Sequence, residues 1–211
     1  MAVGILAYGS LLDDLGEELS ARIARRIDGL KTPFSVEYAR SSRSRDGAPT
    51  LVPVVNGGSS PVAAVFVLDP DIDVVTARTL LFRRESHRAD AQATSDHPPW
   101  IGQLYGPAGI ETCLYVALGA NLRQPTPQQL AQLAARSAAR ESGARRQDGI
   151  SYLDAQLHRG VTTPLTEPYI DAILALTGAH DLGRAWQVVR AAPDRFDGDQ
   201  PLPSPLRAGT G

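Results

Sequence analysis

The chain has 211 residues, enough for one domain with a full hydrophobic core, and its 43% hydrophobic and 21% charged residues are typical of a globular protein. Its formal net charge of −2 provides no general field that would attract nucleic acid or an anionic membrane, so neither is expected as a partner. Cys113 is the single cysteine, which excludes a disulfide within the chain.

An apolar run from Val3 to Ala7 predicts a first strand. No basic residues precede this run and several acidic residues follow it, which is not the pattern of a secretory signal peptide. No apolar run in the sequence approaches the roughly 18 residues that cross a bilayer. We therefore expect a cytoplasmic protein.

A glycine turn, Tyr8-Gly9-Ser10-Leu11-Leu12, follows the first strand and exposes backbone N–H groups that can bind an anion. Beyond the turn, apolar residues recur at every fourth position, at Leu15, Leu19, Ile23 and Ile27. This spacing predicts an amphipathic helix that ends near Gly29. The chain is thus expected to begin with a strand, a turn and a helix.

The apolar pattern then changes to the alternation that is typical of strands. Three strands are predicted, over residues 34–39, 51–55 and 62–68, and the short polar turns between them predict an antiparallel meander. Asp71 is predicted to cap a helix that runs to about Arg88. A polar loop with prolines over residues 91–99 follows, and then two more strands, over residues 100–105 and 111–118.

The second half of the chain has a helical pattern. Helices are predicted over residues 126–141, 150–157, 168–177 and 182–191, with Pro127 at a first helical position and Gly178 as a stop. The segment from Pro193 has four prolines and few apolar side chains, so it cannot bury enough surface to offset its ordering entropy. The predicted division is a core (residues 1–122), a helical extension packed on the core (123–192) and a disordered tail (193–211).

Glu85 is the first candidate for chemistry, because helical geometry places its carboxylate on an apolar face. Each helical residue turns by about 100°. Measured from Val74, the side chains of Ala77, Leu81 and Glu85 lie within roughly 60°. A carboxylate held against apolar side chains is costly to ionise and can both take and return a proton near neutral pH. The spacing therefore suggests a general acid/base.

Each of these two motifs also has a simpler interpretation. Glu85 can pair with an arginine near the end of its helix, and the candidates are Arg84, Arg88 and Arg45. A Tyr-Gly-Ser turn after a strand is common and most often only connects two elements. Neither motif is specific by itself, and only their combination points to one site.

The glycine turn and the later segment Leu80-Leu81-Phe82-Arg83-Arg84-Glu85 together resemble the γ-glutamylcyclotransferase-like family. The resemblance covers roughly residues 3–120, and residues 33–42 and 47–53 are also similar to the second and third strands of bacterial members. It implies an α+β fold with a γ-glutamylcyclotransferase-like mixed β-sheet or small barrel, flanking helices and a helical C-terminal layer.

In that family, the turn after the first strand binds the γ-glutamyl group, and a glutamate near a helix end acts as acid and base. By this resemblance, the substrate-binding residues are Tyr8, Gly9, Ser10 and Leu11, and the catalytic residue is Glu85. The expected reaction releases 5-oxoproline from a γ-glutamyl amine or peptide, without a metal or cofactor. The residues define neither the leaving amine nor an oligomeric state.

A departure from the family pattern keeps a second function open. Leu81-Phe82 stands where the family has Leu-Asp, and the helices after Thr126 carry no motif that can be assigned. The alternative is a non-catalytic binding module of the same fold that recognises a small carboxylated metabolite or a protein partner. Release of 5-oxoproline separates the two functions.

Other chemistries have weaker support in the sequence. Ser10 lacks the second glycine of a nucleophile elbow, and the four histidines are dispersed, which argues against a serine triad and against zinc. Asp69, Asp71 and Asp73 resemble the start of a calcium loop, but Val74 and Leu80 stand where glycine and glutamate are needed. We interpret these aspartates as a strand end and a helix cap.

Overall fold

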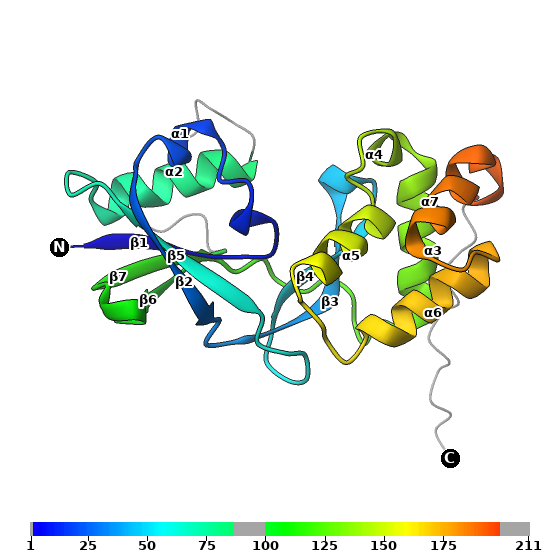
Figure 1. The fold of residues 1–211 in the computed structure, drawn as a ribbon, viewed down its shortest axis with the longest axis horizontal. Coiled ribbons are helices and arrows are strands. Elements are labelled where there is room, and N and C mark those ends of the chain that lie inside the picture. The colour runs from blue at the N-terminus through cyan, green and yellow to red at the C-terminus, as the bar shows by residue number, and fades with distance from the viewer. Residues whose placement is uncertain (1, 87–99, 199–211) are drawn as a thin grey trace, which may run out of the picture. The chain divides into compact units, whose positions relative to one another are not determined.

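The computed structural model describes residues 2–86 and 100–198, and within them the chain is a mixed α+β protein (Figure 1). The chain divides into two compact units. The first comprises Met1–Arg40, Leu51–Asn121 and Gln156–Pro164, and the second comprises Ser41–Thr50, Leu122–Ala155 and Leu165–Gly211. No helix in the described ranges has both the length and the hydrophobicity that crossing a membrane requires.

A five-stranded mixed sheet forms the centre of the first unit (Figure 1). Its strands lie in the order β2 (Ile23–Lys31), β5 (Val62–Leu68), β1 (Val3–Tyr8), β7 (Thr112–Val116) and β6 (Ile101–Tyr105). β1 pairs antiparallel with β5 and parallel with β7, and all six of its residues are buried. Because β1 is held on both sides, the turn that follows Tyr8 starts from a rigid support.

The predicted amphipathic helix after the glycine turn is wrong. In its place are a 3-10 helix, η1 (Gly9–Leu12), a single α-helical turn, α1 (Glu17–Ser20), and the strand β2. A spacing of four fits two strand periods as well as one helical turn, and the β-branched Ile23 and Ile27 favour strands. Both isoleucines pair with β5, which would otherwise have an open edge.

The three strands predicted over residues 34–39, 51–55 and 62–68 are confirmed as β3 (Ser35–Ser42), β4 (Ala48–Val54) and β5. Their predicted arrangement as one meander is wrong, because β3 and β4 form a separate two-stranded sheet and β5 lies between β2 and β1. β5 is apolar at every position, and six of its seven residues are buried. Such a run suits a strand inside a covered sheet.

Helix α2 (Val74–Ser86) begins at a different cap from the one predicted. The carboxylate of Asp73 accepts a hydrogen bond of 2.7 Å from the N–H of Thr76, whereas Asp71 pairs with Arg22. This hydrogen bond to the Thr76 backbone lowers the pKa of Asp73. The helix itself is confirmed, and its cap lies two residues later than expected.

Two more strands of the first unit follow α2 in sequence. The predictions over residues 100–105 and 111–118 are confirmed as β6 and β7, which a short 3-10 helix, η3 (Pro107–Gly109), connects. The predicted helix end at Arg88 and the predicted loop over residues 91–99 lie outside the described residues.

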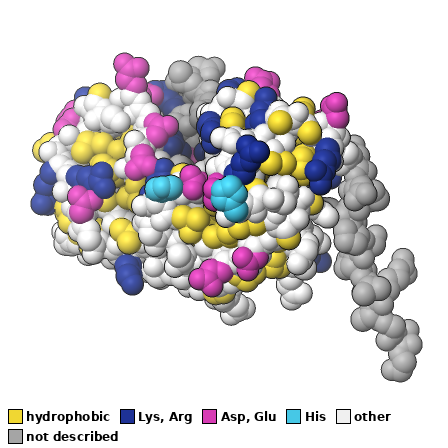
Figure 2. All heavy atoms as spheres, turned by 45° about the vertical axis from the view of Figure 1, so that its right-hand side comes forward, with side chains coloured by type: hydrophobic (Ala, Val, Ile, Leu, Met, Phe, Trp, Pro, Cys, Tyr) yellow, Lys and Arg dark blue, Asp and Glu magenta, His cyan; other side chains and the backbone are white. Residues whose placement is uncertain are grey.

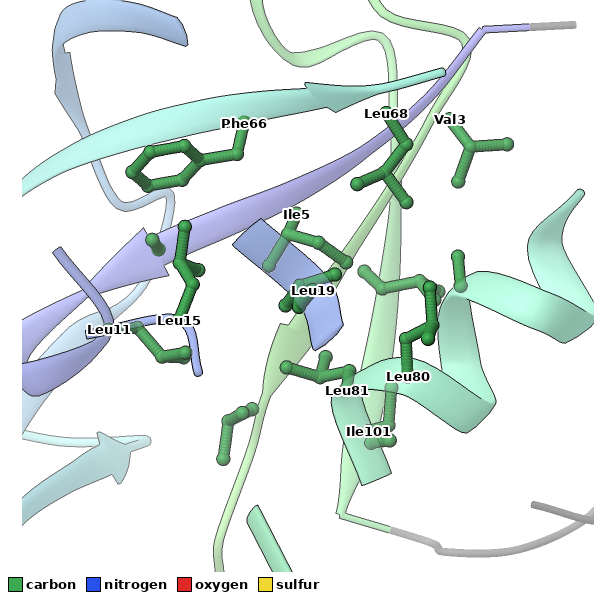
Figure 3. Packing of buried hydrophobic residues seen from close by; sticks show 14 of the residues in the cluster. Val3, Ile5, Leu11, Leu15, Leu19, Phe66, Leu68, Leu80, Leu81 and Ile101 are labelled. Atoms are coloured by element: carbon green, nitrogen blue, oxygen red, sulfur yellow. The ribbon is translucent and has the colours of Figure 1, made fainter. Parts of the chain in front are cut away.

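The core of the first unit lies between α2 and the five-stranded sheet (Figure 3). Ile5 from β1, Leu19 from α1 and Leu81 from α2 point into this space, and each is at most 1% exposed. Leu11 from η1 belongs to the same cluster. The helix that carries Glu85 and the turn that follows β1 therefore share one core.

Helices follow from residue 127 onwards. They are α3 (Pro127–Ala139), α4 (Glu141–Ala144), α5 (Gly149–His158), α6 (Thr166–Thr177), α7 (Leu182–Ala191) and a final 3-10 helix, η4 (Pro193–Arg195). The four predicted helices are confirmed, although the first of them is broken at Arg140 into α3 and α4. Thr126 forms a capping box with Gln129, and Gly178 ends α6 with a φ of 71°. Local signals therefore define these helix ends.

The structure describes residues 193–198, which are part of the segment predicted as a disordered tail. Beyond η4, the carboxylate of Asp197 accepts a hydrogen bond of 2.5 Å from Nε of Arg140, and the carbonyl of Gly198 accepts one from Arg136. These residues belong to the second unit. Residues 199–211 lie outside the described residues, so the prediction for them stays a prediction.

Asp46 follows a 3-10 helix, η2 (Arg43–Arg45), and connects the hairpin tip to α4 within the second unit. Its carboxylate accepts a hydrogen bond of 2.8 Å from the N–H of Ser142, and this bond holds the pKa of Asp46 below its usual value. A lowered pKa in the folded state stabilises the protein above the unfolded-state pKa of about 4. That contribution is lost as the pH falls through the folded-state pKa.

Asp46→Ala is therefore expected to lower the free energy of unfolding by about 1 kcal/mol at pH 7, and by less at a pH below the folded-state pKa. Asp46→Asn keeps an acceptor oxygen and tolerates the φ of 50° at this position, so at neutral pH it should lose only the charge-dependent part of this contribution, less than Asp46→Ala loses, and this loss should disappear at acidic pH. Urea unfolding of the three proteins from neutral to acidic pH measures both effects. An Asp46→Ala loss that does not change with pH would contradict this account.

Candidate active site

The glycine turn follows directly from the central strand β1. Gly9 is buried and has a φ of 58°, a left-handed conformation that residues with a Cβ atom rarely adopt. In a 3-10 helix the carbonyl of residue i bonds to the N–H of residue i+3, so the N–H groups of Gly9 and Ser10 have no acceptor within η1. Ser10 is half-buried. The turn therefore offers two backbone donors and one hydroxyl group at the end of a buried strand.

The side chains of Tyr8 and Leu11 support the turn from two directions. Alternation along β1 puts Tyr8 on the face of the sheet opposite to α2, where its hydroxyl donates to the carbonyl of Val116. Its ring lies edge-on to that of Phe34, with 5.4 Å between the centroids. Leu11 is buried in the core on the α2 side. Of the four predicted substrate-binding residues, Tyr8 and Leu11 thus use their side chains for packing, and Gly9 and Ser10 are left to supply polar groups to a ligand.

Glu85 lies near the C-terminal end of α2, one helical turn beyond Leu81. Ala77 and Leu81, eight and four residues earlier, are both fully buried, so the apolar stripe faces the sheet as helical geometry predicts. The Glu85 side chain is 14% exposed. Its carboxylate is therefore at the end of the buried stripe and mostly sheltered from water.

Arg84 pairs with Glu85 and anchors the end of α2. Its Nη1 donates to Oε1 of Glu85, and its Nη2 donates to the carbonyl of Asp14 at 2.5 Å. A Cβ atom at Gly16 would lie 3.3 Å from Cγ of Arg84, so a glycine there leaves room for this side chain. Both Asp14 and Gly16 belong to the loop between η1 and α1, and α1 lies beside α2 (Figure 1). Arg84 thus joins Glu85 to the segment that follows the glycine turn.

The pair between Arg84 and Glu85 is also what the simpler interpretation of Glu85 predicted. The guanidinium supplies the compensating charge that a sheltered carboxylate needs, and it holds the carboxylate in one orientation. Arg88, another candidate partner, lies outside the described residues. Glu85 therefore has both predicted features: it lies at the end of the apolar stripe, and it forms an ion pair.

A second arginine reaches the same loop. Nε of Arg159 donates to the carboxylate of Asp13 at 2.6 Å, and the Arg159 side chain is 21% exposed. Arg159 belongs to the segment Gln156–Pro164, which is part of the first unit although it follows much of the second in sequence. No motif in the sequence links Arg159 to the turn, and sequence reasoning missed it for this reason. Two guanidinium groups therefore hold the loop between η1 and α1.

The aspartates that resemble a calcium loop have structural roles. Asp69 and Asp71 both lie within ion-pair distance of Arg22, and Asp73 caps α2. The interpretation as a strand end and a helix cap therefore holds for Asp69, directly after β5, and for Asp73, whereas Asp71, the predicted cap, pairs with Arg22. Within the described residues, no three His, Cys, Asp or Glu side chains lie close enough together to hold a metal ion. Two of the four histidines lie outside those residues.

Positive and negative side chains are mixed on the surface. On the face shown in Figure 2, Lys and Arg side chains lie among Asp and Glu and do not gather into one basic patch. The sequence has 21 basic and 23 acidic residues, so neither sign of charge predominates. The local pairing of charge at Glu85 and Asp13 is therefore a more informative feature than any broad field.

Comparison of the chain with protein-family models, with curated proteins and with solved structures found no match. The structure shows an α+β protein with a mixed sheet and several helices. The resemblance to the γ-glutamylcyclotransferase-like family rests on the motif residues alone. The features that point to a function are therefore the glycine turn, Glu85 and Arg84, which connects them.

Proposed function

We propose that this chain is a γ-glutamylcyclotransferase-type enzyme with the corresponding fold, acting in the cytoplasm on a small γ-glutamyl substrate. Its reaction is the intramolecular aminolysis of a γ-glutamyl amide, which releases 5-oxoproline and an amine or amino acid. One observation carries the proposal: Arg84 links the sheltered carboxylate of Glu85 to the loop that follows the glycine turn. An acid/base and a set of backbone donors are the two parts that this reaction needs.

The substrate supplies its own nucleophile in this reaction. Its α-amino nitrogen attacks the γ-carbonyl carbon, the new C–N bond closes a five-membered lactam, and the γ-amide C–N bond breaks to release the amine. The attacking ammonium must lose a proton to become a nucleophile, and the leaving nitrogen must gain one. In full, the α-nitrogen loses two protons in going from an ammonium to the lactam N–H, and the leaving nitrogen gains two in departing as an ammonium. Glu85 takes each proton in turn from the α-nitrogen and returns it to the leaving nitrogen. The steps require no protein nucleophile.

Backbone donors of the glycine turn have the second role. The N–H groups of Gly9 and Ser10 would hold either the α-carboxylate of the substrate or the oxyanion that forms on its γ-carbonyl. Donors fixed in advance stabilise developing charge without reorganisation, and here the left-handed Gly9 and the buried β1 fix them. Arg84 would keep Glu85 aimed at the same region.

Incubation with γ-glutamyl-alanine, γ-glutamyl-amines and glutathione, followed by an assay for 5-oxoproline, tests the proposal. We expect at least one member of this panel to release 5-oxoproline at a rate proportional to the protein concentration. A sample of Glu85→Gln protein at the same concentration corrects for spontaneous cyclisation and for contaminating enzymes. No release from the whole panel would contradict the proposed function.

A non-catalytic binding module of the same fold is the second candidate. The ion pair of Arg84 with Glu85 favours it, because the pair engages the carboxylate that catalysis needs. Such a module would bind a small carboxylated metabolite or a protein partner without turnover. Stabilisation of the protein against heat by 5-oxoproline, combined with no release from the panel, is the result that would select this function.

A further inference from the structure

Glu37 is a second sheltered carboxylate in the first unit, and the proposed reaction does not yet use it. It lies in β3 between two fully buried residues, and it is itself 8% exposed. Its Oε1 accepts hydrogen bonds from the N–H of Tyr38 at 2.8 Å and from Oγ1 of Thr163 at 2.6 Å. Its Oε2 makes no hydrogen bond to the described residues. One oxygen is thus fixed and the other is left for a ligand.

The charge of Glu37 has no counterpart among the described residues. Both of its donors are neutral groups, and no arginine, lysine or histidine of the described chain lies within ion-pair distance. Removing a carboxylate from water is costly unless a cation compensates its charge. Glu85 has Arg84 as such a partner, whereas Glu37 has none. The protein therefore keeps a sheltered negative charge that a cationic ligand can neutralise.

Two contacts connect segments next to Glu37 and Thr163 with the region of the glycine turn. Phe34, three residues before Glu37, has its ring 5.4 Å from that of Tyr8, and three residues of extended chain span about 10 Å. Arg159, four residues before Thr163, pairs with Asp13 in the loop after η1. Phe34 thus contacts Tyr8 at the end of β1, Arg159 contacts the loop after η1, and Glu37 and Thr163 lie three and four residues further along the chain, within the same unit.

We infer that Glu37 binds the α-ammonium group of the γ-glutamyl substrate through Oε2. This inference rests on the proposed function and adds a substrate-binding residue to it. A γ-glutamyl compound carries a carboxylate and an ammonium group on the same α-carbon. The backbone donors of Gly9 and Ser10 suit the carboxylate, and Glu37 suits the ammonium. Glu37 then positions the nitrogen that becomes part of the lactam, while Glu85 remains the group that moves the proton.

This role makes Glu37 a determinant of which ligands bind. A substrate whose α-nitrogen is acylated carries no positive charge and leaves Glu37 without a counterion, so it should be rejected. 5-Oxoproline also has an uncharged lactam nitrogen, so its affinity should not depend on the charge of Glu37. The product would consequently lose the ammonium contact on ring closure, which favours its release.

Glu37→Gln tests the inference, because glutamine keeps a carbonyl oxygen for the bonds from Tyr38 and Thr163 and removes only the charge. L-glutamate carries the ammonium group and 5-oxoproline does not. Calorimetric titration with both ligands therefore separates the contribution of the ammonium contact to the affinity from that of the remaining contacts. We expect the affinity for L-glutamate to fall roughly 10- to 100-fold and the affinity for 5-oxoproline to stay at the wild-type value. Glu111→Gln, at an exposed glutamate of the same unit, is the matched control and should bind both ligands as wild type does.

The outcomes separate this inference from the proposed function. Unchanged L-glutamate affinity in Glu37→Gln, an equal loss for both ligands, or no binding of L-glutamate by the wild-type protein would each overturn the ammonium site. Binding of L-glutamate that depends on Glu37, without release of 5-oxoproline from any substrate, would support the ammonium site and contradict the proposed enzyme. Release with a wild-type KM in Glu37→Gln would support the enzyme and overturn the inference.

Discussion

Replacement of Glu85 by glutamine is expected to lower kcat for 5-oxoproline release by about 10²- to 10⁴-fold, the usual contribution of a positioned acid/base. Glutamine is close to glutamate in size and still accepts a hydrogen bond from Arg84, but it cannot take a proton from the attacking nitrogen. The bond from Arg84 to the carbonyl of Asp14 does not involve the replaced group, so the end of α2 should stay in place. Initial rates at saturating substrate measure kcat.

Glu17→Gln is the matched control for this experiment. Glu17 is an exposed glutamate at the start of α1, in the same unit as Glu85, and its replacement should leave kcat at the wild-type value. Circular dichroism of the variants checks that the fold is retained. If Glu85→Gln releases 5-oxoproline as fast as the wild-type protein does, the activity stands and the assignment of the base to Glu85 is wrong.

Leu81→Ala is expected to lower the free energy of unfolding by about 2–5 kcal/mol. Leu81 is fully buried between α2 and the sheet, close to Ile5 and Leu19 (Figure 3). The core is close-packed, so removal of the side chain loses the transfer free energy of its methyl groups and leaves a cavity. Glu85 lies one turn further along the same helix face, and a looser α2 should therefore also slow the release of 5-oxoproline.

Val75→Ala provides the comparison for this prediction. Val75 lies in the same helix but is 60% exposed, so its truncation should change the stability by no more than about 0.5 kcal/mol. Urea unfolding followed by circular dichroism gives both values under the same conditions. Equal losses for the two variants would mean that the stripe of α2 that ends at Glu85 does not face a packed core.

Features that depend on neighbouring residues could be predicted from the sequence. Thr126 with Gln129 and the left-handed Gly178 define helix ends within a few residues, and the predicted helices around them are confirmed. The orientation of the α2 stripe follows from the helical period alone, so Ala77 and Leu81 are buried as expected. The position of Glu85 at the end of a buried stripe could therefore be predicted from the sequence of this helix alone.

Features that depend on distant pairing could not be predicted in this way. Ile23 and Ile27 have a spacing that fits a helix and a strand equally. This segment forms a strand because it pairs with the edge of β5. The position of β5 between β2 and β1 likewise depends on partners far away in sequence. Contacts around the candidate site are equally distant, since 146 residues separate Asp13 from Arg159 and 126 separate Glu37 from Thr163. Sequence patterns identified the turn and Glu85, and the residues that surround them required the structure.

A crystal structure of the protein with bound 5-oxoproline is the most direct test of whether the glycine turn and Glu85 form one site. We predict that the lactam lies within hydrogen-bond distance of the N–H of Gly9 or Ser10 and of the Glu85 carboxylate. 5-Oxoproline bound away from the turn, or bound at the turn with Glu85 out of reach, would contradict the account.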